Sequence, residues 1–219
     1  WEIFLVSRLP RLLAILCTGV GMSVAGLIMQ QLCSNKFVSP TTGATISSAQ
    51  LGILLALLFM PSSTLWTRAL FAFAAAILGT WIFVWFIQHI QFKDAVMVPL
   101  VGIMCGNVIG GITSYLAYKY EMTQALSSWL LGHFSLVLKG RYEIVWLTVP
   151  LVALAFVFAN HFNIVGLGKD FSRNLGVPYN LVLFSGLTIS AMITASIVVV
   201  VGSISYIGLI VPNVVAMYK

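Results

Sequence analysis

The residue types that usually carry out catalysis or bind metals are few in this sequence, and their spacing fits neither role. His89, His133 and His161 stand far apart, without the close spacing of metal ligands. No Gly-rich phosphate loop of the form GxxxxGK followed by Ser or Thr occurs in the sequence. We therefore expect no catalytic residue, no metal site and no cofactor, and no nucleotide hydrolysis by such a loop.

The composition points to a membrane protein. Of the 219 residues, 60% are hydrophobic and only 7% are charged, whereas a soluble domain carries about 25% charged residues. So few charges could not cover the surface of a soluble globule, and a disordered chain needs low hydrophobicity. The net charge of +6 comes from Lys and Arg scattered singly between apolar runs, so we expect no nucleic-acid partner.

The charges divide the chain into apolar stretches of membrane-spanning length, which is about 20 residues for a helix. The sequence predicts six spans or partial spans, a seventh helix beginning at the C-terminal end, and an interfacial helix within residues 122–141 anchored by Trp129. The predicted spans occupy residues 12–35, 51–60, 69–92, 95–118, 144–165 and 181–201. The small polar run before residue 51 predicts an irregular, protein-covered segment, because bare backbone is not tolerated in lipid. The fold class is therefore an all-α polytopic bundle.

The predicted spans hold few residues that could couple transport to an energy source. No Asp, Glu, Lys, Arg or His lies near the middle of a predicted span, and ion-coupled carriers usually need such residues at depth. This favours an energy source outside the chain. One feature favours close helix packing: Gly102, Gly106 and Gly110 recur every four residues and form a ridge on one helix face.

Three blocks of sequence form a recognisable pattern. The first block, RLPRLLAILCTGVGMSVAGLIMQQLCSNKFVSPTTGA, carries Leu9, Pro10, Arg11, Gly19, Gly26, Gln30, Asn35, Pro40 and Gly43. The second is SSWLLGHF, with Trp129 and Gly132, and the third joins GLGKDFSRNLGV to GSISYIGLIVPNV. Together these blocks resemble the FecCD-type permeases of ABC importers, which take up iron–siderophores, haem and vitamin B12. The third block departs from the family pattern at Ser172, Tyr206 and Asn213, and the sequence is most similar to the catecholate-siderophore branch.

The resemblance implies a bundle of the vitamin B12 permease type, with ten spans. Residues 1–219 would form one transmembrane permease domain, a fragment lacking the first and the last two helices. It implies a multi-pass subunit in the cell (inner or cytoplasmic) membrane, surrounded by lipid, that passes a ferric siderophore inward. It also implies a separate cytoplasmic ATPase subunit, an extracytoplasmic substrate-binding protein and a second permease copy, identical or related. The chain itself would not be an enzyme.

The same resemblance suggests three groups of functional residues. Arg8 and Arg11 would dock the binding protein, since two exposed arginines about one helical turn apart suit carboxylate contacts. Asp94, Ala95 and Val96 would lie at the cytoplasmic gate. The segment that couples the permease to the ATPase would comprise Gly168, Lys169, Asp170, Phe171, Arg173, Leu175 and Gly176.

Several alternatives stay open on the sequence. Within the same family, haem or cobalamin could replace the siderophore as substrate. An ion-coupled secondary carrier would need an ionisable residue at mid-membrane, and a membrane anchor or assembly subunit would not transport at all. The distribution of Lys and Arg between the two sides is six against five, which does not decide the orientation.

Overall fold

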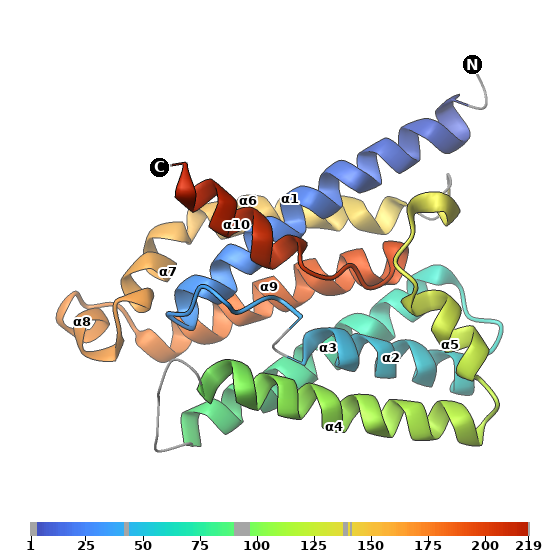
Figure 1. The fold of residues 1–219 in the computed structure, drawn as a ribbon, viewed down its shortest axis with the longest axis horizontal. Coiled ribbons are helices and arrows are strands. Elements are labelled where there is room, and N and C mark those ends of the chain that lie inside the picture. The colour runs from blue at the N-terminus through green and yellow to red at the C-terminus, as the bar shows by residue number, and fades with distance from the viewer. Residues whose placement is uncertain (1–3, 42–43, 90–96, 138–139, 141, 219) are drawn as a thin grey trace.

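The computed structural model describes residues 4–41, 44–89, 97–137, 140 and 142–218, and in this part of the chain every regular element is helical (Figure 1). A π-helix at Phe4–Arg8 leads into the first α-helix, and 3-10 turns lie at Phe134–Leu136 and Glu143–Leu147. The α-helices are α1 (Leu9–Leu32), α2 (Thr45–Phe59), α3 (Leu65–His89), α4 (Met97–Lys119), α5 (Thr123–Leu130), α6 (Thr148–Val157), α7 (Ala159–Gly166), α8 (Lys169–Asn174), α9 (Tyr179–Val201) and α10 (Ile207–Met217). The all-helical expectation is confirmed.

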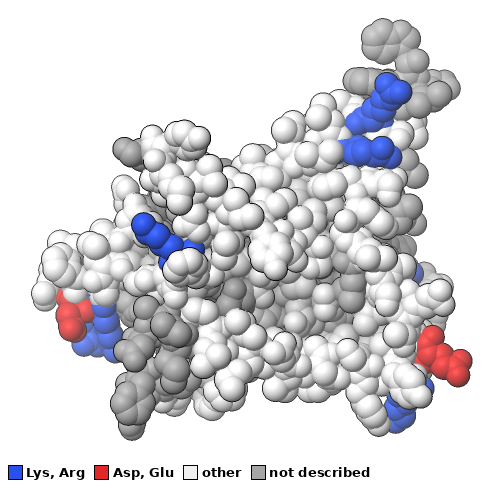
Figure 2. Space-filling view, in the orientation of Figure 1, with Lys and Arg blue, Asp and Glu red and all other residues white. Residues whose placement is uncertain are grey.

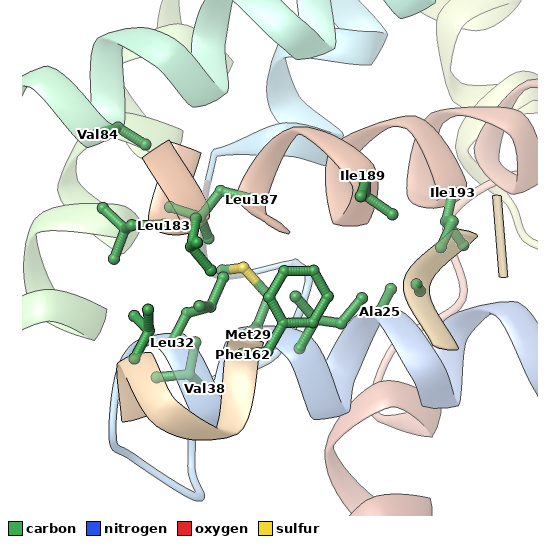
Figure 3. Packing of buried hydrophobic residues seen from close by; sticks show 14 of the residues in the cluster. Ala25, Met29, Leu32, Val38, Val84, Phe162, Leu183, Leu187, Ile189 and Ile193 are labelled. Atoms are coloured by element: carbon green, nitrogen blue, oxygen red, sulfur yellow. The ribbon is translucent and has the colours of Figure 1, made fainter. Parts of the chain in front are cut away.

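Helices α1 and α9 lie side by side and run in opposite directions through the middle of the bundle (Figure 1). The Ser190 hydroxyl of α9 donates a hydrogen bond to the Ala25 carbonyl of α1 at 3.2 Å. Figure 3 shows Met29 of α1 and Phe162 of α7 packed beneath Leu183 and Leu187 of α9. Burial of this apolar cluster, worth about 25 cal/mol per Å² removed from solvent, holds the three helices together.

The bundle has two ends, which are named here by the residues that mark them. At the Arg11 end, the Arg11 guanidinium donates to the Ser135 carbonyl at 3.2 Å, and the His133 N–H donates to the Val201 carbonyl at 3.0 Å. At the Gly166 end, the Ser34 hydroxyl donates to the Gly166 carbonyl at 2.8 Å. Figure 2 shows the charged side chains gathered towards the two ends of the long axis, with an almost uncharged surface between them on the face in view.

Four helices, α1, α3, α4 and α9, are long and apolar enough to cross a membrane, which supports a multi-pass protein. The sequence predicts a further span over residues 144–165, and in the structure the helices of this region are bent. Helix α6 ends at Val157, α7 begins at Ala159, and the two parts differ in direction by 59°. Neither Pro nor Gly marks the break. Instead the rings of Phe158 and Phe162 lie 6.4 Å apart, and Phe162 turns into the core.

Helices α2 and α10, with 15 and 11 residues, are shorter than the four long helices α1, α3, α4 and α9, and each follows one of these long helices in the chain. Residues 33–41 run back from the end of α1 along the bundle, as residues 202–206 do between α9 and α10 (Figure 1). The short span is therefore confirmed, but α2 begins at Thr45 rather than at Leu51. Its polar first turn is satisfied inside the protein, because Thr45 and Thr80 share a hydroxyl hydrogen bond of 3.3 Å.

Candidate functional site

The Arg11 end carries the two arginines predicted to dock a binding protein, and the structure gives them different surroundings. Arg8, in the last turn of the π-helix, is exposed and makes no hydrogen bond in the described part of the chain. Arg11 is half-buried, its Nη2 is bonded to the Ser135 carbonyl, and its buried Nε has no hydrogen-bond partner. Arg11 therefore joins α1 to the segment after α5, whereas Arg8 is available to a partner.

Helix α8, in the segment predicted to couple to an ATPase, lies beyond the Gly166 end of the bundle (Figure 1). Two glycines frame it, Gly168 with φ 109° and Gly176 with φ 72°. These φ values lie in the region where a side chain is strained, so the turn into the helix and the turn out of it both favour glycine. The Ser172 hydroxyl donates to the Gly168 carbonyl at 2.8 Å and to the Ile164 carbonyl at 3.2 Å, which fixes α8 against α7.

The side chains of α8 mostly face outwards. Ser172 is its one buried residue, whereas Lys169, Asp170, Phe171 and Arg173 are exposed. Phe171 is 59% exposed, and the neighbouring apolar side chains of Leu167 and Leu175 are exposed as well. Helix α8 therefore presents three charges and an aromatic ring outwards, while its own backbone is fixed from beneath.

The α7–α8 segment is also fixed to α1. Besides the bond between Ser34 and Gly166, the backbone of Gly166 lies so close to Gln31 that a methyl group at Gly166 would stand 2.9 Å from the Gln31 carbonyl oxygen. A displacement of α8 therefore has to involve the end of α1, or break these contacts.

The structure says less about two other groups of predicted residues. Asp94, Ala95 and Val96 lie outside the described residues. On α4, Gly102 is buried, while Gly106 and Gly110 are half-buried. A methyl group at Gly106 would lie 3.6 Å from the Ser47 hydroxyl and one at Gly110 would lie 4.0 Å from it, so the ridge faces the start of α2 at ordinary contact distance.

Between the two ends, the described polar side chains are mostly hydroxyls, and most of these donate hydrogen bonds to backbone carbonyls. Thr148 and Ser196 share a hydrogen bond of 3.0 Å, and Thr194 donates to the Ser190 carbonyl at 2.8 Å. Among the described residues, no group of three His, Cys, Asp or Glu side chains could hold a metal ion.

Sequence reasoning missed two features near the middle of α1. The backbones of Gly26 and Gly208 are in direct contact, so that α1 and α10 cross without intervening side chains. Beside this crossing lies an open cavity of about 220 Å³ lined by Ser39, Thr41, Ser205, Tyr206 and Leu209. The runs SPTT and GSISY are polar stretches between apolar helices, and this was the available signal.

The fold has a counterpart of known structure. It is similar to the solved inward-facing conformation of an ABC transporter assigned to the metal-chelate type, with a TM-score of 0.81. The match covers 99% of this chain and 70% of the other, at 24% sequence identity. The likeness establishes the fold, an all-helical bundle like that of this transporter.

Comparison with characterised sequences leads to permeases of siderophore uptake. The chain is 47% identical over 213 residues to the petrobactin import system permease protein YclN of Bacillus subtilis, covering 97% of this chain and 67% of that protein. It is 36% identical over 217 residues to the ferric-anguibactin transport system permease protein FatD of Vibrio anguillarum, covering 99% and 69%. The chain thus spans about two thirds of the length of these relatives. The FecCD transport family model matches residues 1–219, and the chain belongs to the FecCD transport family.

Proposed function

We propose that the chain is the membrane-spanning permease part of an ABC importer that carries a ferric siderophore into the cell. The observation that carries the proposal is the family match over residues 1–219, together with relatives named for petrobactin and anguibactin uptake. Two different siderophores among the relatives support the substrate class rather than one compound. Haem and cobalamin are the next substrates to test.

The structure supports an energy source outside the chain. The described spans hold no ionisable side chain in their middle, so coupling to an ion gradient has no residue to act through in this part of the protein. Helix α8 offers the alternative, since its exposed Lys169, Asp170, Phe171 and Arg173 form a surface that an ATPase subunit could engage. The Gly166 end would then face the cytoplasm, and the membrane would be the cytoplasmic one.

Two further partners follow from the same orientation. The Arg11 end would face outwards, where exposed Arg8 could meet carboxylates of a substrate-binding protein. A second permease copy has a candidate surface on α4, where large apolar side chains remain exposed along one face. These are Leu100, Ile103, Met104, Val108 and Ile112. Their spacing of three or four residues is that of a helix face that packs against another helix.

The test is uptake of radiolabelled ferric petrobactin in cells that carry the full-length gene. The double variant Asp170→Lys with Arg173→Glu should reduce uptake to background while the amount of protein in the membrane is unchanged. Lys36→Glu is the matched control, because Lys36 is also exposed at the Gly166 end but lies outside α8. Uptake by the wild type should withstand an ionophore that collapses the ion gradient while cellular ATP is maintained.

Each outcome has a distinct meaning. No petrobactin uptake by the wild type would remove the substrate proposal, and haem and cobalamin would be tried next. Uptake that collapses with the ion gradient at constant ATP would favour a secondary carrier. Unchanged uptake in the double variant would remove the coupling role of α8 but leave the siderophore proposal standing.

A further inference from the structure

Two non-helical segments enter the bundle from opposite ends and meet inside it. Residues 33–41 run inwards from the Gly166 end, and residues 202–206 run inwards from the Arg11 end (Figure 1). Pro40 of the first segment lies against Gly208, at the start of α10. Asn213 of α10 donates a hydrogen bond to the Lys36 carbonyl at 2.9 Å, so the two segments are joined at a second point.

The meeting point lies well inside the apolar thickness of the bundle. Gly208 contacts the backbone of Met22 and Gly26. Met22 lies 13 residues after Leu9 and 10 before Leu32 in α1, which at 1.5 Å per residue is roughly 20 Å from one end of the helix and 15 Å from the other. Non-helical backbone at such depth is tolerated only where protein covers it or where it lines a water-filled space.

The space beside this point is polar. Ser39, Thr41, Ser205 and Tyr206 supply hydroxyl groups, and Leu209 completes the lining of the cavity of about 220 Å³. Thr41 directs both its N–H and its hydroxyl to the Ser39 hydroxyl, the latter at 3.1 Å, which fixes the geometry of one wall. None of the lining residues is charged, so the cavity can offer hydrogen bonds but no strong electrostatic well.

Tyr206 is the residue in this cavity with the most unusual backbone. Its φ of 70° lies in the left-handed region, which is uncommon for a bulky side chain. The side chain is 69% exposed, and its residue forms the N-cap of α10 without a side-chain hydrogen bond to the helix. A strained backbone that turns a tyrosine into an open polar space is the kind of arrangement found at functional sites.

We propose that this hydroxyl-lined cavity contacts the ferric siderophore during its passage, with the Tyr206 hydroxyl donating a hydrogen bond to an oxygen atom of the chelate. The inference rests on the proposed function and adds the residues that touch the substrate. Hydroxyl groups donate hydrogen bonds to the oxygen-rich surface of an anionic chelate, but they bind it less tightly than a positively charged side chain would. A cavity of this size is below the roughly 300 Å³ of a small-molecule pocket, so it takes one arm of the chelate rather than the whole.

The first experiment compares Tyr206→Phe with Tyr118→Phe in the full-length transporter, reconstituted with its ATPase subunit and binding protein. Tyr118, on α4, is the matched control because it is exposed and lies outside the cavity. A typical net hydrogen bond is worth roughly a two- to tenfold change in an equilibrium or rate. Ferric petrobactin uptake should therefore fall about three- to tenfold in Tyr206→Phe, and stay at the wild-type rate in Tyr118→Phe.

Three outcomes of this comparison are distinguishable. No uptake by the wild type overturns the substrate and this inference together. If the wild type transports ferric petrobactin and Tyr206→Phe transports it equally well, the proposed hydrogen bond is overturned but the substrate is not. If Tyr206→Phe lowers ATPase subunit binding as much as it lowers uptake, then Tyr206 has a structural role, and the inference is also overturned.

The second experiment asks whether the cavity lies on an aqueous route. In a transporting variant whose three native cysteines are replaced, Ser205→Cys should react with a small water-soluble thiol reagent, and ferric petrobactin should slow the reaction. Leu78→Cys, exposed on the apolar surface of α3, is the control and should react far more slowly. An unreactive Ser205→Cys, or a reaction rate that the substrate leaves unchanged, would overturn the inference independently of Tyr206.

Discussion

The carbonyl oxygen of Gly208 lies where the side chain of residue 26 would begin, so α1 and α10 cross backbone against backbone at Gly26. A methyl group at Gly26 would collide with the Gly208 peptide unit, and the obstacle is rigid backbone rather than a movable side chain. Such a crossing depends on small residues, as do many close helix contacts in membranes.

Gly26→Ala should therefore destabilise the full-length protein by about 1–3 kcal/mol, the usual cost of overpacking. The measurement is the thermal unfolding midpoint in detergent. Gly19→Ala is the control, because Gly19 is half-buried with no atom within 4 Å of a methyl group built there, and an alanine with free space in a helix should be neutral or favourable by up to about 1 kcal/mol. Equal midpoints for the two variants would contradict the close crossing.

Arg8→Glu should slow the association of the substrate-loaded binding protein about tenfold at low salt, because surface charges mainly set the encounter rate. The difference from wild type should shrink as salt screens the charges. Lys36→Glu changes the charge equally at the opposite end and should have little effect. If the association with Arg8→Glu remains slow at high salt, Arg8 has a structural role instead.

Phe171→Ala should weaken binding of the ATPase subunit about tenfold, since exposed aromatic side chains are frequent anchors of protein interfaces. Titration of the purified ATPase subunit against the permease in lipid nanodiscs measures this directly. Phe59→Ala removes an even more exposed ring at the other end of the bundle and should not change the affinity. Equal affinities for wild type and Phe171→Ala would exclude Phe171 as an anchor.

The break between α6 and α7 offers a further prediction. A cavity of about 70 Å³ lies beside the break, lined by Ala155, Ala159 and Phe162 and by residues of α1. If the α7–α8 segment pivots there during transport, Ala159→Leu should fill the cavity and slow uptake severalfold without lowering the unfolding midpoint. Ala153→Leu, on the exposed face of α6, is the control. Normal uptake in Ala159→Leu would mean that the cavity is passive.

The sequence predicted those features of the fold that depend on length and charge. The uncharged residues 12–35 predicted α1, and the structure places it at Leu9–Leu32. Helix α9 was predicted over residues 181–201 for the same reason, and it begins only two residues earlier. Solvation in lipid requires long apolar helices, so composition alone locates them.

Features set by packing between distant segments could not be predicted in this way. The break at Phe158 follows from how Phe162 fits the core, and the sequence there contains no Pro or Gly. The polar first turn of α2 forms because Thr45 meets Thr80, which is 35 residues away. The roles of Arg8, Arg11 and the α8 residues came from family resemblance, and they remain predictions until they are tested.

Helix α1 begins beside Arg8 and Arg11 and ends beside Ser34, whose hydroxyl is bonded to the segment that carries α8. One rod of 24 residues, about 36 Å long, therefore spans the distance between the two proposed docking surfaces. Thermodynamic linkage makes communication between two binding sites reciprocal. If the nucleotide state of an ATPase partner alters the affinity for a binding protein through this rod, then the arrival of a loaded binding protein must alter nucleotide affinity by the same factor.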